Sequence, residues 1–342
     1  MLIKRLFALF CGFLLAASAY VFVFHYQFGA RMPSEAWVGC AAILKEEILK
    51  RDVSDNRILI YSGSNSIYGI DSEKLTEASG REVFNMSLHA GLPMEYLVWQ
   101  IMKQAKAGDT LLMPLEYDYY TDTEGFEEWF THAVMCWEQD YYEELSLYQK
   151  FEFMSSVRAS RVFFGAFFKA NQGRIDPFLK KYRNPDRNWI VKDVEDAWSK
   201  GEYRMPLFPT SYNRRGDMMM NEGGGISGND RYLKGERVSD YFAAHYRSLM
   251  EYAEENAIRV YLIWPVSMKN PSFDLGKKSD QERFARFRES LDSEGVQVYG
   301  DAEKLQLPRE LFYNTQYHLN SEGRTVWTDR IATILKEAGE FL

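Results

Sequence analysis

Ser64 lies in a sequence setting that suits a nucleophilic hydroxyl. The apolar run 57–61 (RILIY) is typical of a buried strand, and residues 62–66 (SGSNS) after it are typical of a tight turn. A serine nucleophile needs its hydroxyl exposed at such a strand-to-helix turn, where backbone N–H groups and the positive end of the next helix can face a developing oxyanion. Gly63 permits close approach of a substrate. Ser64 is therefore the candidate nucleophile.

His318 is the matching candidate for a general base. It lies in the segment 313–323 (YNTQYHLNSEG), directly before a predicted helix. Neutral imidazole is the usual base for serine, since a pKa near 6.5 lets it accept and return a proton at neutral pH. Asn314, four residues earlier, can orient the imidazole but cannot stabilise its cation with a charge. Asp301 is an alternative orienting group, and a capping or core role is the alternative for His318.

These two segments carry a family resemblance. Residues 62–65 (SGSN), followed by 68–71 (YGID), resemble the first conserved block of the SGNH (GDSL-type) hydrolases, and residues 313–323 resemble the last. The form of these blocks is similar to that in membrane-anchored proteins that acylate cell-surface polymers. These include the proteins of alginate and cellulose O-acetylation and the D-alanyl transfer protein of lipoteichoic acid synthesis. The resemblance implies that Ser64, His318 and Asn314 form the catalytic set. It covers only short pieces of the chain.

The resemblance also implies an oxyanion hole made of the serine N–H, a glycine N–H after the second strand and an asparagine side chain after the third. Residues 85–91 resemble the second block, so Gly91 or Ala90 would supply the backbone donor. Glu116 stands where the asparagine would be, and a carboxylate accepts hydrogen bonds unless its pKa is raised. The residues expected to form the oxyanion hole or line the site are Gly63, Asn65, Asn85, Gly91, Glu116 and Tyr317.

The elements around these motifs alternate between strands and helices. Apolar runs predict strands at 57–61, 82–86, 110–115, 259–264 and 296–299. Helical spacing predicts helices at 34–51, 94–107, 241–256, 281–294 and 321–338. All-apolar strands that alternate with helices indicate an α/β fold whose parallel sheet is covered by helices on both faces, and the resemblance implies the SGNH-like three-layer sandwich. Loops at the carboxyl ends of such strands hold the reactive groups.

The N-terminus predicts a membrane segment. Residues 6–24 carry no charge and follow Lys4 and Arg5, so the run just spans a hydrocarbon core of about 30 Å. The basic flank predicts a cytoplasmic N-terminus and a periplasmic or extracellular main domain. A cleaved signal peptide is the alternative, because residues 17–19 (ASA) resemble a cleavage site, although the apolar run continues past them. We expect an anchor over 1–30, a juxtamembrane helix over 31–53 and the main domain over 54–342.

Composition excludes some functions. A chain of 342 residues, 46% of them hydrophobic, can build a sizeable core, and its net charge of −8 argues against a nucleic-acid surface. His89, His132 and His245 show no metal-ligand spacing with one another or with cysteine. Cys40 and Cys136 could form a disulfide or be separate buried thiols.

An aromatic-rich insertion is expected at about 117–235. Aromatic faces suit carbohydrate binding, and a cap near the membrane could grip a lipid-linked donor, but aromatic residues at helical spacing are more often core. We expect a helical cap over the active edge of the sheet. The aromatic residues include Tyr119, Tyr120, Phe126, Trp129, Phe130, Trp137, Tyr141, Tyr142, Tyr148, Phe151 and Phe153.

The resemblance implies serine-dependent transfer of an acyl group, most simply acetyl, to a cell-surface or exported polysaccharide. The expected partners are this polymer and an integral-membrane acyltransferase that presents the acyl group. No cofactor or metal is expected. Two alternatives remain: a membrane-anchored carbohydrate esterase or deacetylase, and a non-catalytic scaffold of a polysaccharide-modification complex.

Overall fold

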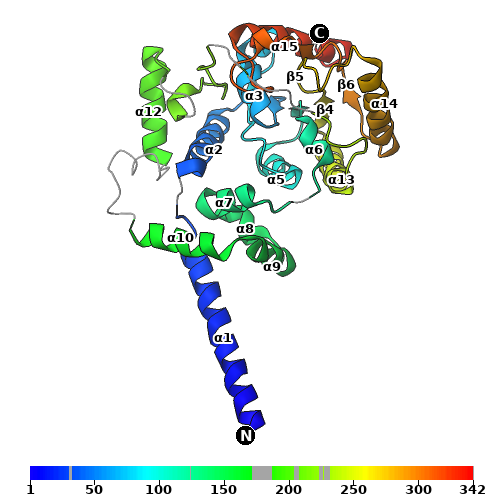
Figure 1. Ribbon diagram of the computed structural model, residues 1–342. Coiled ribbons are helices and arrows are strands. Elements are labelled where there is room, and N and C mark those ends of the chain that lie inside the picture. Colours follow the sequence, from blue (N-terminus) through cyan, green and yellow to red (C-terminus); the bar gives the residue numbers. More distant parts are fainter. Residues whose placement is uncertain are drawn as a thin grey trace. The chain divides into compact units, whose positions relative to one another are not determined.

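The computed structural model of the chain describes residues 1–30, 33–123, 125–171, 187–203, 208–222, 226 and 232–341 (Figure 1). The chain forms two compact units. Unit 1 comprises Met1–Gly39 and Phe126–Asp186, and unit 2 comprises Cys40–Gly125 and Arg187–Leu342. Ser64, Asn314 and His318 all belong to unit 2.

Unit 2 is built on a parallel sheet. In the described part of the chain this sheet has five strands in the order β2-β1-β3-β4-β6. Their bounds are β1 Ile58–Ile60, β2 Val83–Asn85, β3 Thr110–Met113, β4 Arg259–Ile263 and β6 Val298–Tyr299. The first three strands are buried along their whole length, which explains their all-apolar or nearly all-apolar sequences. The α/β class and the parallel sheet are thereby confirmed.

The strand order creates a switch point at β1. The chain passes from β1 to β2 on one side and then to β3 on the other, so connections leave the two sides of β1 in opposite directions. In open α/β sheets a crevice forms at the carboxyl end of such a strand. The turn that carries Ser64 follows β1 at this point.

Helices follow most of the strands in unit 2. Their bounds are α2 Pro33–Arg51, which begins in unit 1, α3 Ser64–Gly69, α4 Ser72–Ser79, α5 Met94–Gln104, α6 Tyr117–Thr121, α12 Arg187–Lys200, α13 Asp240–Glu255, α14 Lys278–Ser293 and α15 Ser321–Glu337. α15 packs against α3 and α4, while α13 packs against α5 and β4. The Asn320 side chain caps α15 by accepting a hydrogen bond from the Gly323 N–H. The capping residue lies two residues after His318, and the helix begins at the next residue.

The main strands and helices predicted from the sequence are confirmed, with the strands slightly shorter than expected. A second small sheet was not predicted. It pairs β5 (Ser267–Met268) with β7 (Gln306–Leu307), and strands of two residues are too short to show a period. In the described part of the insertion predicted at about 117–235, α6, α12 and the helices of unit 1 given below are helical, as expected.

Unit 1 is helical. It contains α1 (Leu2–Tyr26), α7 (Glu128–Trp137), α8 (Gln139–Glu144), α9 (Leu147–Ser156) and α10 (Ala159–Ala170). Its core gathers aromatic rings, with Phe24 of α1 lying 6.2 Å from Tyr142 and 6.4 Å from Phe153 between ring centroids. Many of the insertion's aromatic side chains are buried, which favours their interpretation as core.

α1 is long and apolar enough to cross a membrane. It has 25 residues, and its most apolar stretch has a mean hydropathy of 2.3 with none of its residues buried. Cys11, Cys40 and Cys136 are not disulfide-bonded, so the possible Cys40–Cys136 disulfide is not formed in the structure.

Candidate active site

Ser64, His318 and Asn314 form a continuous hydrogen-bonded chain. The Ser64 Oγ lies 2.8 Å from the Nε2 of His318, and the Nδ1 of His318 lies 2.7 Å from the Oδ1 of Asn314. With an acceptor oxygen at Nδ1, the imidazole carries its proton there and offers the Nε2 lone pair to the serine hydroxyl. The chain is in the orientation that a serine nucleophile and its base require.

Local structure positions both ends of this chain. Ser64 is the first residue of α3, immediately after the β1 turn. The backbone around His318 is folded into a tight loop, in which the Tyr313 N–H donates to the His318 carbonyl and the His318 N–H donates to Thr315. The Tyr68 ring stacks on the imidazole, with a centroid distance of 4.2 Å and an interplanar angle of 18°. Imidazole rotation is therefore restricted by stacking as well as by hydrogen bonds.

The imidazole of His318 is a weak base in this setting. Burial, with a smaller contribution from nearby His89, lowers the pKa of His318 from 6.5 to about 3. Asn314 supplies no negative charge that would oppose this shift. His318 is neutral near pH 7 and able to accept a proton, but the imidazolium that forms during proton transfer is poorly stabilised.

Glu116 clamps the turn that carries Ser64. Its carboxylate accepts hydrogen bonds from the Gly63 N–H at 3.0 Å, the Asn65 N–H at 3.0 Å and the Ser62 hydroxyl at 3.0 Å. The Asn65 N–H is one of the donors at the start of α3 that has no partner within the helix. Glu116 therefore acts as an acceptor that holds the nucleophile turn, as its residue type suggested.

Gly63 is required by this packing. A Cβ atom at position 63 would lie 2.5 Å from Glu116 Oε1 and 2.7 Å from Ala90 Cα. These distances are too short for any side chain. The sequence suggested that Gly63 allows close approach of a substrate. In the structure, Glu116 and Ala90 occupy the space beside its Cα.

Burial raises the pKa of Glu116 from 4.5 to about 7, against the effect of its hydrogen-bond donors. The folded protein therefore binds this proton more tightly than the unfolded chain. Stability from this group is complete below about pH 4.5 and is lost as pH rises through 7, by about 3 kcal/mol in all.

A Glu116→Gln variant tests this linkage. We expect its free energy of unfolding, relative to wild type, to improve by about 3 kcal/mol between pH 4.5 and pH 8, because the wild type alone must bury a charge. The substitution also alters hydrogen bonds, but this changes the free energy of unfolding by the same amount at every pH. The change between pH 4.5 and pH 8 is therefore unaffected. Thermal unfolding of wild type and variant in detergent across this pH range measures the change. If the stability of the two proteins depends on pH in the same way, Glu116 has an ordinary pKa.

Two backbone N–H groups near the nucleophile turn are available as hydrogen-bond donors. The Ser64 N–H makes no hydrogen bond with the described residues, and neither does that of Ala90, whose backbone lies against Gly63. The Gly91 N–H donates to the Nδ1 of His89 at 2.9 Å. Of the two donors suggested for the second block, Ala90 is thus the one whose N–H is available.

The other residues expected to line the site have structural partners. The Asn65 side chain donates to the Pro114 carbonyl at 2.7 Å. The Tyr317 hydroxyl accepts from the Tyr117 N–H at 3.3 Å, and its ring packs against another tyrosine. The exposed Asp301 accepts a hydrogen bond from the Glu303 N–H in its own turn, while Asn314 occupies the orienting position at His318.

Asn85 belongs to a buried network centred on Asp217. The Asn85 amide donates to Asp217 at 2.9 Å and to the Ser66 carbonyl in α3 at 2.8 Å. Asp217 also accepts from the backbone N–H and hydroxyl of Ser72 and from the Asn213 amide. Asn85 therefore supports the helix that begins with Ser64, instead of facing the substrate.

An Asp217→Ala variant should be strongly destabilised. It leaves four buried donors without their acceptor, and we expect a loss of about 3–5 kcal/mol in the free energy of unfolding. Asp329→Ala is the matched control, since Asp329 is 58% exposed and pairs with a surface lysine. Thermal unfolding in detergent compares the two variants; equal midpoints would contradict a central role for Asp217.

Sequence reasoning missed Tyr68 and Asp217 as parts of the site. Tyr68 lies within the first motif, and its distance from Ser64 puts it on the same side of a helix, which was a usable signal. Asp217 lies in a segment without a helical or strand pattern, so its contact with α3 could be found only from the fold.

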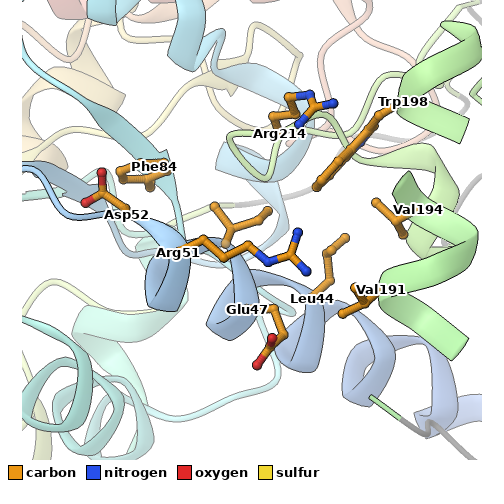
Figure 2. Close-up of a pocket in the computed structure, with 10 residues that line it drawn as sticks. Leu44, Glu47, Arg51, Asp52, Phe84, Val191, Val194, Trp198 and Arg214 are labelled. Carbon is orange, nitrogen blue, oxygen red and sulfur yellow. The ribbon is translucent and has the colours of Figure 1, made fainter. Parts of the chain in front are cut away.

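A cavity elsewhere in unit 2 lacks the groups for this chemistry. It has a volume of about 220 Å³ and lies between α2, α12 and Phe84 of β2 (Figure 2). Leu44, Val194 and Trp198 provide apolar walls, and Arg51 and Arg214 lie at its side. None of its described lining residues is a serine, cysteine or histidine.

No metal-ligand group of three or more His, Cys, Asp or Glu residues occurs among the described residues. Comparison of the chain with protein-family models, curated proteins and solved structures finds no match. The case for a function therefore rests on the geometry of Ser64, His318 and Asn314.

Proposed function

We propose that the protein is a serine-dependent acyltransferase of the SGNH type, anchored by α1, which transfers an acetyl group to a cell-surface or exported polysaccharide. The observation that carries the proposal is the hydrogen-bonded chain from Ser64 through His318 to Asn314. The position of Ser64 after β1, at the switch point of a parallel sheet, supports the SGNH-like three-layer fold.

The reaction has two symmetrical halves. In the first, His318 Nε2 takes the Ser64 proton while Oγ bonds to the acyl carbonyl carbon, and the imidazolium then returns that proton to the departing group. In the second, a sugar hydroxyl gives its proton to His318 and attacks the acyl carbon. The Ser64 Oγ leaves and regains a proton from the imidazolium.

The Ser64 and Ala90 N–H groups are the oxyanion donors in this proposal. Both are backbone groups, so no side chain has to move when negative charge develops on the carbonyl oxygen. Glu116 contributes by holding Gly63 and Asn65 on either side of the nucleophile. The proposed chemistry needs no cofactor.

α1 supports a location in the cell membrane. Lys4 and Arg5 precede the apolar stretch, and the usual charge bias favours a cytoplasmic N-terminus. In this proposal the rest of the chain after α1 lies outside the cytoplasm. An integral-membrane acyltransferase would supply the acyl group in the same membrane, and the polysaccharide would be the acceptor.

An esterase is the second candidate. Asn314 is exposed, so solvent reaches the orienting end of the hydrogen-bonded chain. Water could then resolve the acyl-enzyme in place of a sugar hydroxyl.

An acceptor assay separates these functions. The full chain in detergent is incubated with 4-nitrophenyl acetate, with and without alginate or cellulose oligosaccharides, and the products are identified by mass. Acetylated oligosaccharide made by wild type and not by Ser64→Ala supports transfer, whereas acetate alone supports the esterase. Absence of turnover in a folded protein favours a non-catalytic scaffold.

A further inference from the structure

Two helices of unit 1 expose large apolar side chains to solvent. On α10, Phe163, Phe164 and Phe167 are 57%, 50% and 64% exposed. On α9, Leu147, Tyr148 and Phe151 are 88%, 70% and 63% exposed. In each helix these positions are i, i+1 and i+4, which lie on one side of a helix. We call these six residues the aromatic face.

The opposite sides of the same helices form the core of unit 1. Val162 and Gly165 of α10 and Phe153 of α9 are buried. α9 and α10 are therefore amphipathic helices whose second apolar side is left uncovered. Six large apolar residues in two adjoining elements exceed the scattered exposed side chains of an ordinary soluble surface.

Both helices pack at the end of α1 that is farthest from the N-terminus (Figure 1). A Cβ at Gly165 of α10 would lie 2.6 Å from the Gln27 side chain, so the helices approach closely. The Lys169 ammonium donates to the Phe28 carbonyl and lies 5.4 Å from the ring centroid of Tyr26. On α9, Phe153 contacts the ring of Phe24.

This contact lies at the depth where a membrane span would end. About 20 helical residues cross the hydrocarbon core, so a span that starts after Arg5 reaches the far boundary near Tyr26. Aromatic residues and lysines concentrate at that boundary, since their rings and stems are apolar and their polar groups remain hydrated. Phe22 and Tyr26 of α1 are also exposed, and the ring of Tyr26 lies beside Lys169 of α10.

We propose that the aromatic face of α9 and α10 lies in the headgroup region of the membrane that α1 crosses, with phospholipid as its partner. The inference rests on the anchoring role proposed for α1 and is independent of the serine chemistry. Interfacial helices of this kind bury one apolar side in the boundary between headgroups and acyl chains. The contact would hold α9 and α10 against the membrane surface, so that α1 is not their only attachment to the membrane.

Photocrosslinking in the full chain tests this contact. p-Benzoylphenylalanine replaces Phe164 or Phe151, which changes little because both rings are exposed, and the protein is irradiated in membranes that contain radiolabelled phospholipid. The same residue in place of Phe13 of α1, which is 69% exposed, is the control for the anchor. The same residue in place of Arg288, an exposed position of α14, is the negative control.

We expect lipid adducts at positions 164 and 151 to exceed those at position 288 by about fivefold or more, because side chains of an interfacial helix are buried among the lipids. Lipid labelling at 13 but not at 164 or 151 overturns the proposal while leaving the anchor intact. Adducts at 164 or 151 to a second protein also overturn it, because the face would then bind an integral-membrane partner. Absence of labelling at 13 as well would refute the anchor on which the proposal depends.

Discussion

Replacing His318 with glutamine should lower the rate of Ser64 acetylation by 4-nitrophenyl acetate by about 10³-fold. Glutamine fills similar space but cannot accept the serine proton, so the hydroxyl must attack without a base. The burst of nitrophenol, followed by stopped-flow absorbance, measures this rate directly. The 2.8 Å distance between His318 Nε2 and Ser64 Oγ is the basis for the prediction.

His245→Gln is the matched control for this experiment. His245 lies in α13 of unit 2 and contacts the Tyr241 ring, with no hydrogen bond to Ser64 among the described residues. Its rate should equal that of wild type. A His318→Gln rate within tenfold of wild type, in a folded protein, would mean that another group activates Ser64 or that Ser64 is not the nucleophile.

Asn314→Asp should raise the same rate by about 10- to 100-fold at pH 7, because a carboxylate would stabilise the imidazolium that forms during proton transfer. Asparagine and aspartate are nearly isosteric, so the carboxylate can keep the 2.7 Å contact with Nδ1. The new charge also raises the pKa of His318 above its present value of about 3. A base works only above its pKa, so the acid limb of the rate should move to higher pH in the variant.

Position 314 could act by orienting the imidazole or by stabilising its charge. The acetylation rates of wild type, Asn314→Asp and Asn314→Ala between pH 4 and pH 9 distinguish these two roles. Wild type should show little acid loss down to about pH 4, since its imidazole stays neutral there. Asn314→Ala loses the orienting contact and should be slower than wild type. An Asn314→Asp variant no faster than wild type would show that charge at this position does not limit the reaction.

The sequence was sufficient to predict the main elements of the sheet and the meeting of Ser64 with His318. Apolar runs mark buried strands, and parallel strands bring their carboxyl ends to one edge, so a turn after the first strand and a loop before the last helix could be expected to converge. The roles of the surrounding residues were harder to predict, because they depend on which atoms meet.

Asn85 illustrates this limit. Its place in the second block suggested an oxyanion-hole or site-lining role, but its amide donates to Asp217 and to the Ser66 carbonyl. Asp217 comes from a distant irregular segment, and only the folded chain brings it to α3. The residue type of Glu116 was enough to predict that it accepts hydrogen bonds. Its three donors could be identified only from the structure.

The most direct test of the account is the intact mass of the full chain after incubation with 4-nitrophenyl acetate, for wild type and Ser64→Ala, followed by peptide mapping. The account predicts one acetyl group on the wild-type peptide that contains Ser64 and none on the variant. A folded wild-type protein that gains no acetyl group, or an adduct that persists in Ser64→Ala, would contradict the proposal that Ser64 is an acyl-accepting nucleophile.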